Sequence, residues 1–147
     1  MIYNEKEFKE EIDYNYIDEE IRGDIKEINN KYEGIVTLDS CAGHIRDNQF
    51  VNPTITLGFG TYELFREFTM RFLLIRWVPE NDFFNIKVDR WENWVNIPEG
   101  VFTLSITTNF SKTITDKKIL EEIRMEFFSR VKIVLKMLDP IESELQK

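Results

Sequence analysis

The chain has 147 residues, one cysteine, one histidine and a formal net charge of −8. This length predicts a single domain over residues 1–147, and 42% hydrophobic residues can form a core without disulfides, which excludes intrinsic disorder. The negative charge makes nucleic acid an unlikely partner, because the field of the protein repels phosphates. With one cysteine, no signal-like N-terminus and no long apolar run, we expect a cytoplasmic protein without a membrane segment.

Two helices are expected at the start of the chain. The first is short, over residues 5–11. The second, over residues 18–31, is predicted by four isoleucines at spacings of four, four and three, which place them on one helical face: Ile17, Ile21, Ile25 and Ile28. The acidic residues of this region could bind metal in pairs, but a solvated helix face is the simpler interpretation: Asp13, Asp18, Glu19, Glu20, Asp24 and Glu27.

Two strands and a helix follow. The β-branched residues at 35–38 predict a short strand. Residues 54–59 alternate between large apolar side chains and Thr or Gly, which predicts a strand buried on one side only. A helical period then runs from Thr61, a suitable N-cap, to Trp77, and Pro79 ends it.

The last part of the chain predicts three strands, over residues 84–88, 94–97 and 102–110, and a long helix from Thr115-Asp116 to Asp139-Pro140. The order of elements is therefore helix, two strands, helix, three strands, helix. This order predicts an α+β fold, specifically a two-layer sandwich. Its sheet would have about five strands in an antiparallel or mixed arrangement, with helices on one face and solvent on the other.

The candidate site is the loop Ser40-Cys41-Ala42-Gly43-His44, directly after the first strand. It holds the only cysteine and the only histidine of the chain. The glycine permits a sharp turn, and successive N–H groups in such a turn can bind an anion. The residues expected to line a ligand site are Asp39, Ser40, Cys41, Gly43, His44 and Arg46, with the arginine in contact with an anionic group.

Three interpretations of this loop stay open. Cys41 could be a nucleophile whose thiol pKa is lowered by His44. The same two residues could be half of a metal site that Asp39 or Asp47 completes. A tight turn with a small buried cysteine and a surface histidine is the simplest interpretation of the spacing alone.

Residues Ile17 to Ile45 resemble the N-terminal part of the tRNA wybutosine-synthesising protein 3 family. The shared features are the acidic start of an amphipathic helix, Ile28-Asn29 near its end, the strand Val36-Thr37-Leu38, and the loop, which in that family reads Ser-Cys-Ser-Gly-Arg. This resemblance implies S-adenosylmethionine as a cofactor and modification of a nucleoside. The loop is also similar to a Ser-Cys-Ser-Gly-His pattern in uncharacterised bacterial and phage proteins.

We therefore expect either a small-ligand or nucleotide-binding protein, distantly similar to that family, or a non-catalytic interaction protein such as a phage or plasmid accessory or inhibitor protein. Whether the chain is an enzyme stays open. The second function would use an exposed aromatic patch around Trp91 or Trp94. These belong to an aromatic group, flanked by Arg76 and Arg90, that could also fill the core or stack on a flat ligand: Trp77, Phe83, Phe84, Trp91 and Trp94.

Overall fold

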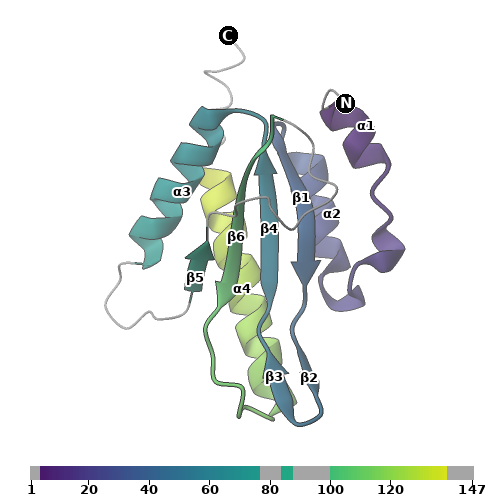
Figure 1. Cartoon of the computed structure of the whole chain (residues 1–147), viewed down its shortest axis with the longest axis vertical. Coiled ribbons are helices and arrows are strands. Elements are labelled where there is room, and N and C mark those ends of the chain that lie inside the picture. Colours follow the sequence, from purple (N-terminus) through teal and green to yellow (C-terminus); the bar gives the residue numbers. More distant parts are fainter. Residues whose placement is uncertain (1–3, 77–83, 88–99, 139–147) are drawn as a thin grey trace.

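The computed structural model describes residues 4–76, 84–87 and 100–138 (Figure 1). Its elements are α1 (Glu5–Glu10), the 3₁₀ turns η1 (Tyr14–Tyr16) and η2 (Glu19–Ile21), α2 (Arg22–Lys31), β1 (Ile35–Cys41), β2 (His44–Arg46), β3 (Gln49–Val51), β4 (Thr54–Phe59), α3 (Tyr62–Arg76), β5 (Phe84–Lys87), β6 (Phe102–Thr108) and α4 (Lys117–Met137). The predicted mixture of helices and sheet, an α+β fold, is confirmed.

The described strands form two antiparallel sheets. Four strands pair in the order β1-β4-β6-β5, and β2 and β3 pair separately as a hairpin. The strand expected over residues 94–97, and most of the aromatic group expected to flank it, lie outside the described residues. A single sheet of about five strands therefore stays a prediction.

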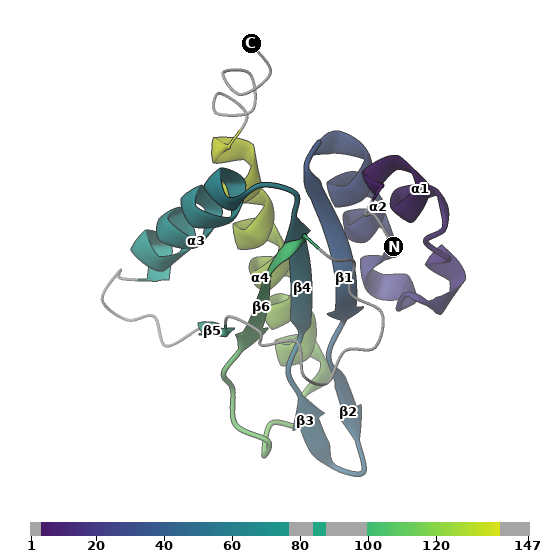
Figure 2. The same ribbon diagram turned by 45° about the horizontal axis from the view of Figure 1, so that its top comes forward.

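The main core lies between one side of the four-stranded sheet and the helices. Figures 1 and 2 both show α2 and α4 behind the sheet, and α3 contacts β4, β6 and α4. The sheet contributes Ile55, Leu57, Leu104 and Ile106, and the helices contribute Ile25, Ile28, Phe68, Phe127 and Val131, all with no exposed surface. Burial of this apolar surface is the main force that holds the helices on the sheet. Among the described residues, no helix is long and apolar enough to cross a membrane.

Strand β4 is buried on both sides, so the prediction that it is buried on one side only is wrong. Thr56 is 5% exposed, and its hydroxyl lies 2.7 Å from that of Ser105 on β6, which satisfies both groups. Gly58 lies under Val101, whose Cγ1 would be 2.7 Å from an added Cβ. β4 is an inner strand, and contacts from β6 and from the segment before it cover its polar side.

Asn29 joins α2 to β1. It lies inside α2, is 2% exposed, and its side chain donates to Ile25 O and Thr37 Oγ1 and accepts from Thr37 N–H. The pairing of β1 with β4 shifts register just after this point, between Thr37 and Asp39. These buried hydrogen bonds fix the start of β1 against α2, and η2 continues directly into α2.

Two predicted helix starts are confirmed. Thr61 Oγ1 accepts from Leu64 N–H at 3.2 Å, and Asp116 accepts from Lys118 N–H at 2.8 Å. Each side chain satisfies a backbone donor that has no partner within its helix, as an N-cap does.

The β2–β3 hairpin was not predicted. Its turn residues, Asp47 and Asn48, have φ of 52° and 61°, the left-handed conformation that two-residue hairpin turns require. Phe50 in β3 is 2% exposed, contacts the edge of Phe110, and donates its N–H to Lys112 O at 3.0 Å. The hairpin is therefore packed against the chain that follows β6, and the loop after β1 is shorter than expected.

Candidate functional site

The candidate site begins at the two-residue turn Ala42-Gly43 between β1 and β2, where the fold is tightly packed. Both residues are buried, and Gly43 has φ of 82°. A Cβ at Gly43 would lie 2.8 Å from Pro53 Cδ and 3.0 Å from Leu120 Cδ1. Glycine is needed here for the backbone conformation and for the space, so its role is in the turn itself.

Hydrogen bonds from Asp18, from the neighbouring Cys41 and from Arg124 hold the backbone of the turn. Asp18 Oδ2 accepts from Ala42 N–H at 2.8 Å, and Gly43 N–H points to Cys41 Sγ at 3.4 Å. On the carbonyl side, Arg124 of α4 donates to Ala42 O and Gly43 O at 2.8 and 3.3 Å. These two N–H groups therefore have acceptors within the protein, whereas an anion cradle needs N–H groups that are free to donate.

Three side chains of types that can ligate a metal ion meet beside this turn. The carboxylate of Asp18, Cys41 Sγ and a ring nitrogen of His44 all lie within 4.8 Å of one another. His44 Nε2 is 3.1 Å from Asp18 Oδ2, and the side chains of His44 and Asp18 are 25% and 30% exposed. The cluster is thus fixed by the fold and accessible to solvent.

The electrostatics of the cluster disfavour a reactive thiolate. Burial raises the pKa of the Cys41 thiol, and the negative charges of Asp18 and Asp39 raise it further, against the N–H of Gly43 and the charge of Arg46. Partial desolvation likewise raises the pKa of the Asp39 carboxyl group, with a further contribution from Asp18. An activated nucleophile needs a lowered thiol pKa, so this arrangement does not support the cysteine–histidine nucleophile.

The other predicted site residues are distributed on different sides of the cluster. Successive side chains of a strand point to opposite faces, so Asp39 lies on the same face of β1 as Cys41, and Ser40 lies on the opposite face. Arg46 lies exposed in β2, close enough for its charge to act on the Cys41 thiol. Asp47 lies in the hairpin turn and is not part of the cluster.

Asp18 is the site residue that sequence reasoning missed. It was assigned to a solvated helix face, but it precedes η2 and bonds to Ala42 and His44. Asp24 and Glu27, from the same acidic set, form ion pairs with Lys132 of α4 at 2.5 and 3.0 Å. No sequence signal places these partners together, since they are far apart along the chain.

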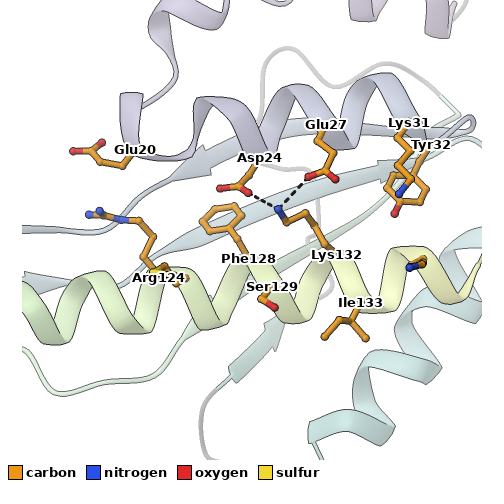
Figure 3. Close-up of a pocket in the computed structure, with 12 residues that line it drawn as sticks. Glu20, Asp24, Glu27, Lys31, Tyr32, Arg124, Phe128, Ser129, Lys132 and Ile133 are labelled. Carbon is orange, nitrogen blue, oxygen red and sulfur yellow. Dashed lines mark hydrogen bonds and ion pairs between the residues drawn. The ribbon is translucent and has the colours of Figure 1, made fainter.

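A groove of about 500 Å³ lies between α2 and α4 (Figure 3). Lys132 reaches across it to Asp24 and Glu27, so an ion-pair bridge spans the middle of the groove. Arg124 lines the groove and also holds the β1–β2 turn, whereas neither Cys41 nor His44 lines it. The groove and the three-residue cluster are therefore separate features that share one arginine.

No protein-family model matches this chain, and neither the curated proteins nor the solved structures include a significant match.

Proposed function

We propose that this protein binds a small ligand at the cluster of Asp18, Cys41 and His44 beside the β1–β2 turn. The observation that carries the proposal is the meeting of three different donor side chains within 4.8 Å. Two of them come from β1 and β2, and the third comes from the segment before η2. Such convergence of polar groups is typical of a binding site.

The surrounding structure supports binding because it orders the site in advance. Asp18 and Arg124 hold the turn backbone, and Gly43 packs against Pro53, while the thiol and the imidazole stay partly exposed. A site that is already ordered loses little conformational entropy when its ligand binds. Arg46 is available at its edge for an anionic part of a ligand, and the family resemblance would make that ligand nucleotide-like or S-adenosylmethionine.

Native mass spectrometry of the chain purified from its own host tests this proposal. The wild type is expected to carry a bound mass that the double variant Cys41→Ala/His44→Ala lacks. Asp47→Asn is the matched control, because it removes a nearby negative charge without touching the cluster, and it should keep the ligand. A wild type without any bound mass, or a double variant that retains it, would count against the proposal.

A second candidate function, protein interaction, is favoured by exposed apolar side chains on α3 and α4. Leu74 and Met125 are 70% and 73% exposed, and Met70, Ile133 and Met137 are about half exposed. The two helices contact each other, so these side chains lie on neighbouring elements. Exposed apolar surface of this kind often binds another protein.

Substitution separates this function from ligand binding. If the helix surface binds a partner, Leu74→Glu combined with Met125→Glu should abolish complex formation in size-exclusion chromatography. Cys41→Ala/His44→Ala should leave the complex intact. The opposite pattern would assign the interaction to the cluster instead.

A further inference from the structure

We infer that this cluster holds a divalent transition-metal ion of the zinc type, coordinated by Asp18, Cys41 and His44. This inference rests on the proposed function and names the ion through which the site would hold its small ligand. It concerns side chains from three segments of the chain, and each supplies one donor atom.

The spacing of the donor atoms suits such an ion. Zinc binds sulfur at about 2.3 Å and nitrogen or oxygen at about 2.0–2.2 Å, so tetrahedral ligands lie roughly 3.3–3.8 Å apart. The three donors lie within 4.8 Å of one another, and His44 Nε2 and Asp18 Oδ2 are 3.1 Å apart. The backbone therefore already brings the three donor segments close to the spacing that a tetrahedral ion requires.

The chemistry of the donors selects the metal class. Thiolate and imidazole favour zinc and related transition metals over magnesium or calcium, which prefer oxygen ligands. The hydrogen bond from Ala42 N–H orients the Asp18 carboxylate. Hydrogen bonds from the outer shell commonly orient metal ligands in this way. The set is therefore a transition-metal set with one oriented carboxylate.

Charge also favours a cation. Asp18 brings its carboxylate within 4.8 Å of Cys41 Sγ, so the site offers an acidic group beside the thiol. On binding, the S–H bond of Cys41 breaks, a sulfur–metal bond forms, and the proton passes to the solvent. The thiolate and the Asp18 carboxylate then balance the two positive charges of the metal ion.

Three protein ligands leave one tetrahedral position for water or a ligand atom. Structural zinc sites usually have four protein ligands, whereas sites with three ligands bind an exchangeable group in the fourth position. Cys41 and His44 are both partly exposed, so solvent can reach that position. An exchangeable position distinguishes this site from a purely structural one.

Titration of the chelator-treated full chain with Co²⁺ tests the inference. Binding of one equivalent should give thiolate-to-cobalt charge-transfer absorption in the near ultraviolet and strong tetrahedral bands in the visible. Added Zn²⁺ should remove both signals. Calorimetry of Zn²⁺ binding in buffers of different ionisation enthalpy should report release of about one proton, which comes from the thiol.

Single substitutions assign the ligands. Cys41→Ser should eliminate the charge-transfer band, and His44→Ala and Asp18→Asn should weaken Zn²⁺ binding by more than the roughly 10–100-fold that loss of an outer-shell partner costs. Asn at position 18 keeps an acceptor for Ala42 N–H, and circular dichroism checks that each variant is folded. Asp47→Asn is the control and should bind Zn²⁺ as the wild type does.

Lack of charge-transfer absorption in the wild type, or equal Zn²⁺ affinity in wild type and Cys41→Ser, would overturn the inference. The two experiments together distinguish failure of the metal inference from failure of the proposed function. If the host-purified protein carries an organic ligand that depends on Cys41 and His44 but binds no metal, the metal inference fails alone. If neither ligand is found, both fail.

Discussion

Replacement of Gly43 by alanine tests how firmly packing fixes the turn that carries the cluster. Gly43 has φ of 82°, and an added Cβ would lie 2.8 Å from Pro53 Cδ and 3.0 Å from Leu120 Cδ1. The left-handed conformation costs a residue with a side chain about 1–2 kcal/mol. Overpacking adds about 1–3 kcal/mol, since the proline ring cannot rotate away. The free energy of unfolding should therefore fall by about 2–5 kcal/mol.

Two other glycines separate the contributions. Gly100 has φ of 90° but no atom within 4 Å of an added Cβ, so Gly100→Ala should show the backbone cost alone, about 1–2 kcal/mol. Gly23 lies in α2 with equally open space, and Gly23→Ala should stabilise the protein by about 0.5–1 kcal/mol. The three variants thus differ in sign and size for stated reasons.

Urea unfolding followed by circular dichroism measures these differences through the midpoint and slope of each transition. The free energy lost in Gly43→Ala, minus that lost in Gly100→Ala, gives the contribution of contacts with Pro53 and Leu120. If the two losses are equal, packing does not fix the turn. A stabilised Gly43→Ala variant would refute the described turn conformation itself.

Two pH-dependent predictions follow from the raised pKa values of Cys41 and Lys132. Burial and two neighbouring carboxylates raise the pKa of Cys41, so iodoacetamide should alkylate the metal-free folded protein more slowly at neutral pH than the urea-unfolded chain; faster alkylation would contradict this. Desolvation lowers the pKa of Lys132, but Asp24 and Glu27 outweigh it and the pKa is raised. Its stabilising contribution is therefore complete below the unfolded pKa, about 10.4, and is lost as the pH rises through the folded pKa. Lys132→Met should lose about 0.5–1 kcal/mol at neutral pH and converge with the wild type at higher pH in urea unfolding, and a constant difference would contradict this.

Elements with a strong local pattern were predictable from the sequence. The isoleucine spacing predicted α2, and the alternation over residues 54–59 predicted β4 with its observed bounds. Helix caps at Thr61 and Asp116 were also predictable, because a cap depends on residues within one turn. Each of these features is determined by residues that lie close together along the chain.

Features that depend on distant residues were not predictable. The β2–β3 hairpin has strands of three residues, too short for a pattern, and its turn uses Asp47 and Asn48 without a glycine. The burial of Thr56 depends on Ser105, which lies on another strand. Local alternation shows which side chains share a face, but it does not show what covers that face.

The candidate site was half predictable for the same reason. The only cysteine and histidine drew attention to the turn, and the structure brings their side chains together. The carboxylates that the sequence predicts, Asp39 and Asp47, are the ones nearest to the loop along the chain. The carboxylate in the cluster is Asp18, which tertiary contacts bring to the turn.

The contact between His44 and Asp18 does not by itself account for the cluster. A partly exposed contact of this kind contributes about 0–1 kcal/mol, and the turn is already held through Ala42 N–H and Arg124. A metal ion present at a thousand times its dissociation constant would stabilise the folded state by about 4 kcal/mol. The hydrogen bond to Ala42 N–H explains why a carboxylate is needed at Asp18. It does not explain why a thiol and an imidazole lie beside that carboxylate. The chemistry of these groups, rather than the strength of the contact between His44 and Asp18, is what supports the proposed ligand.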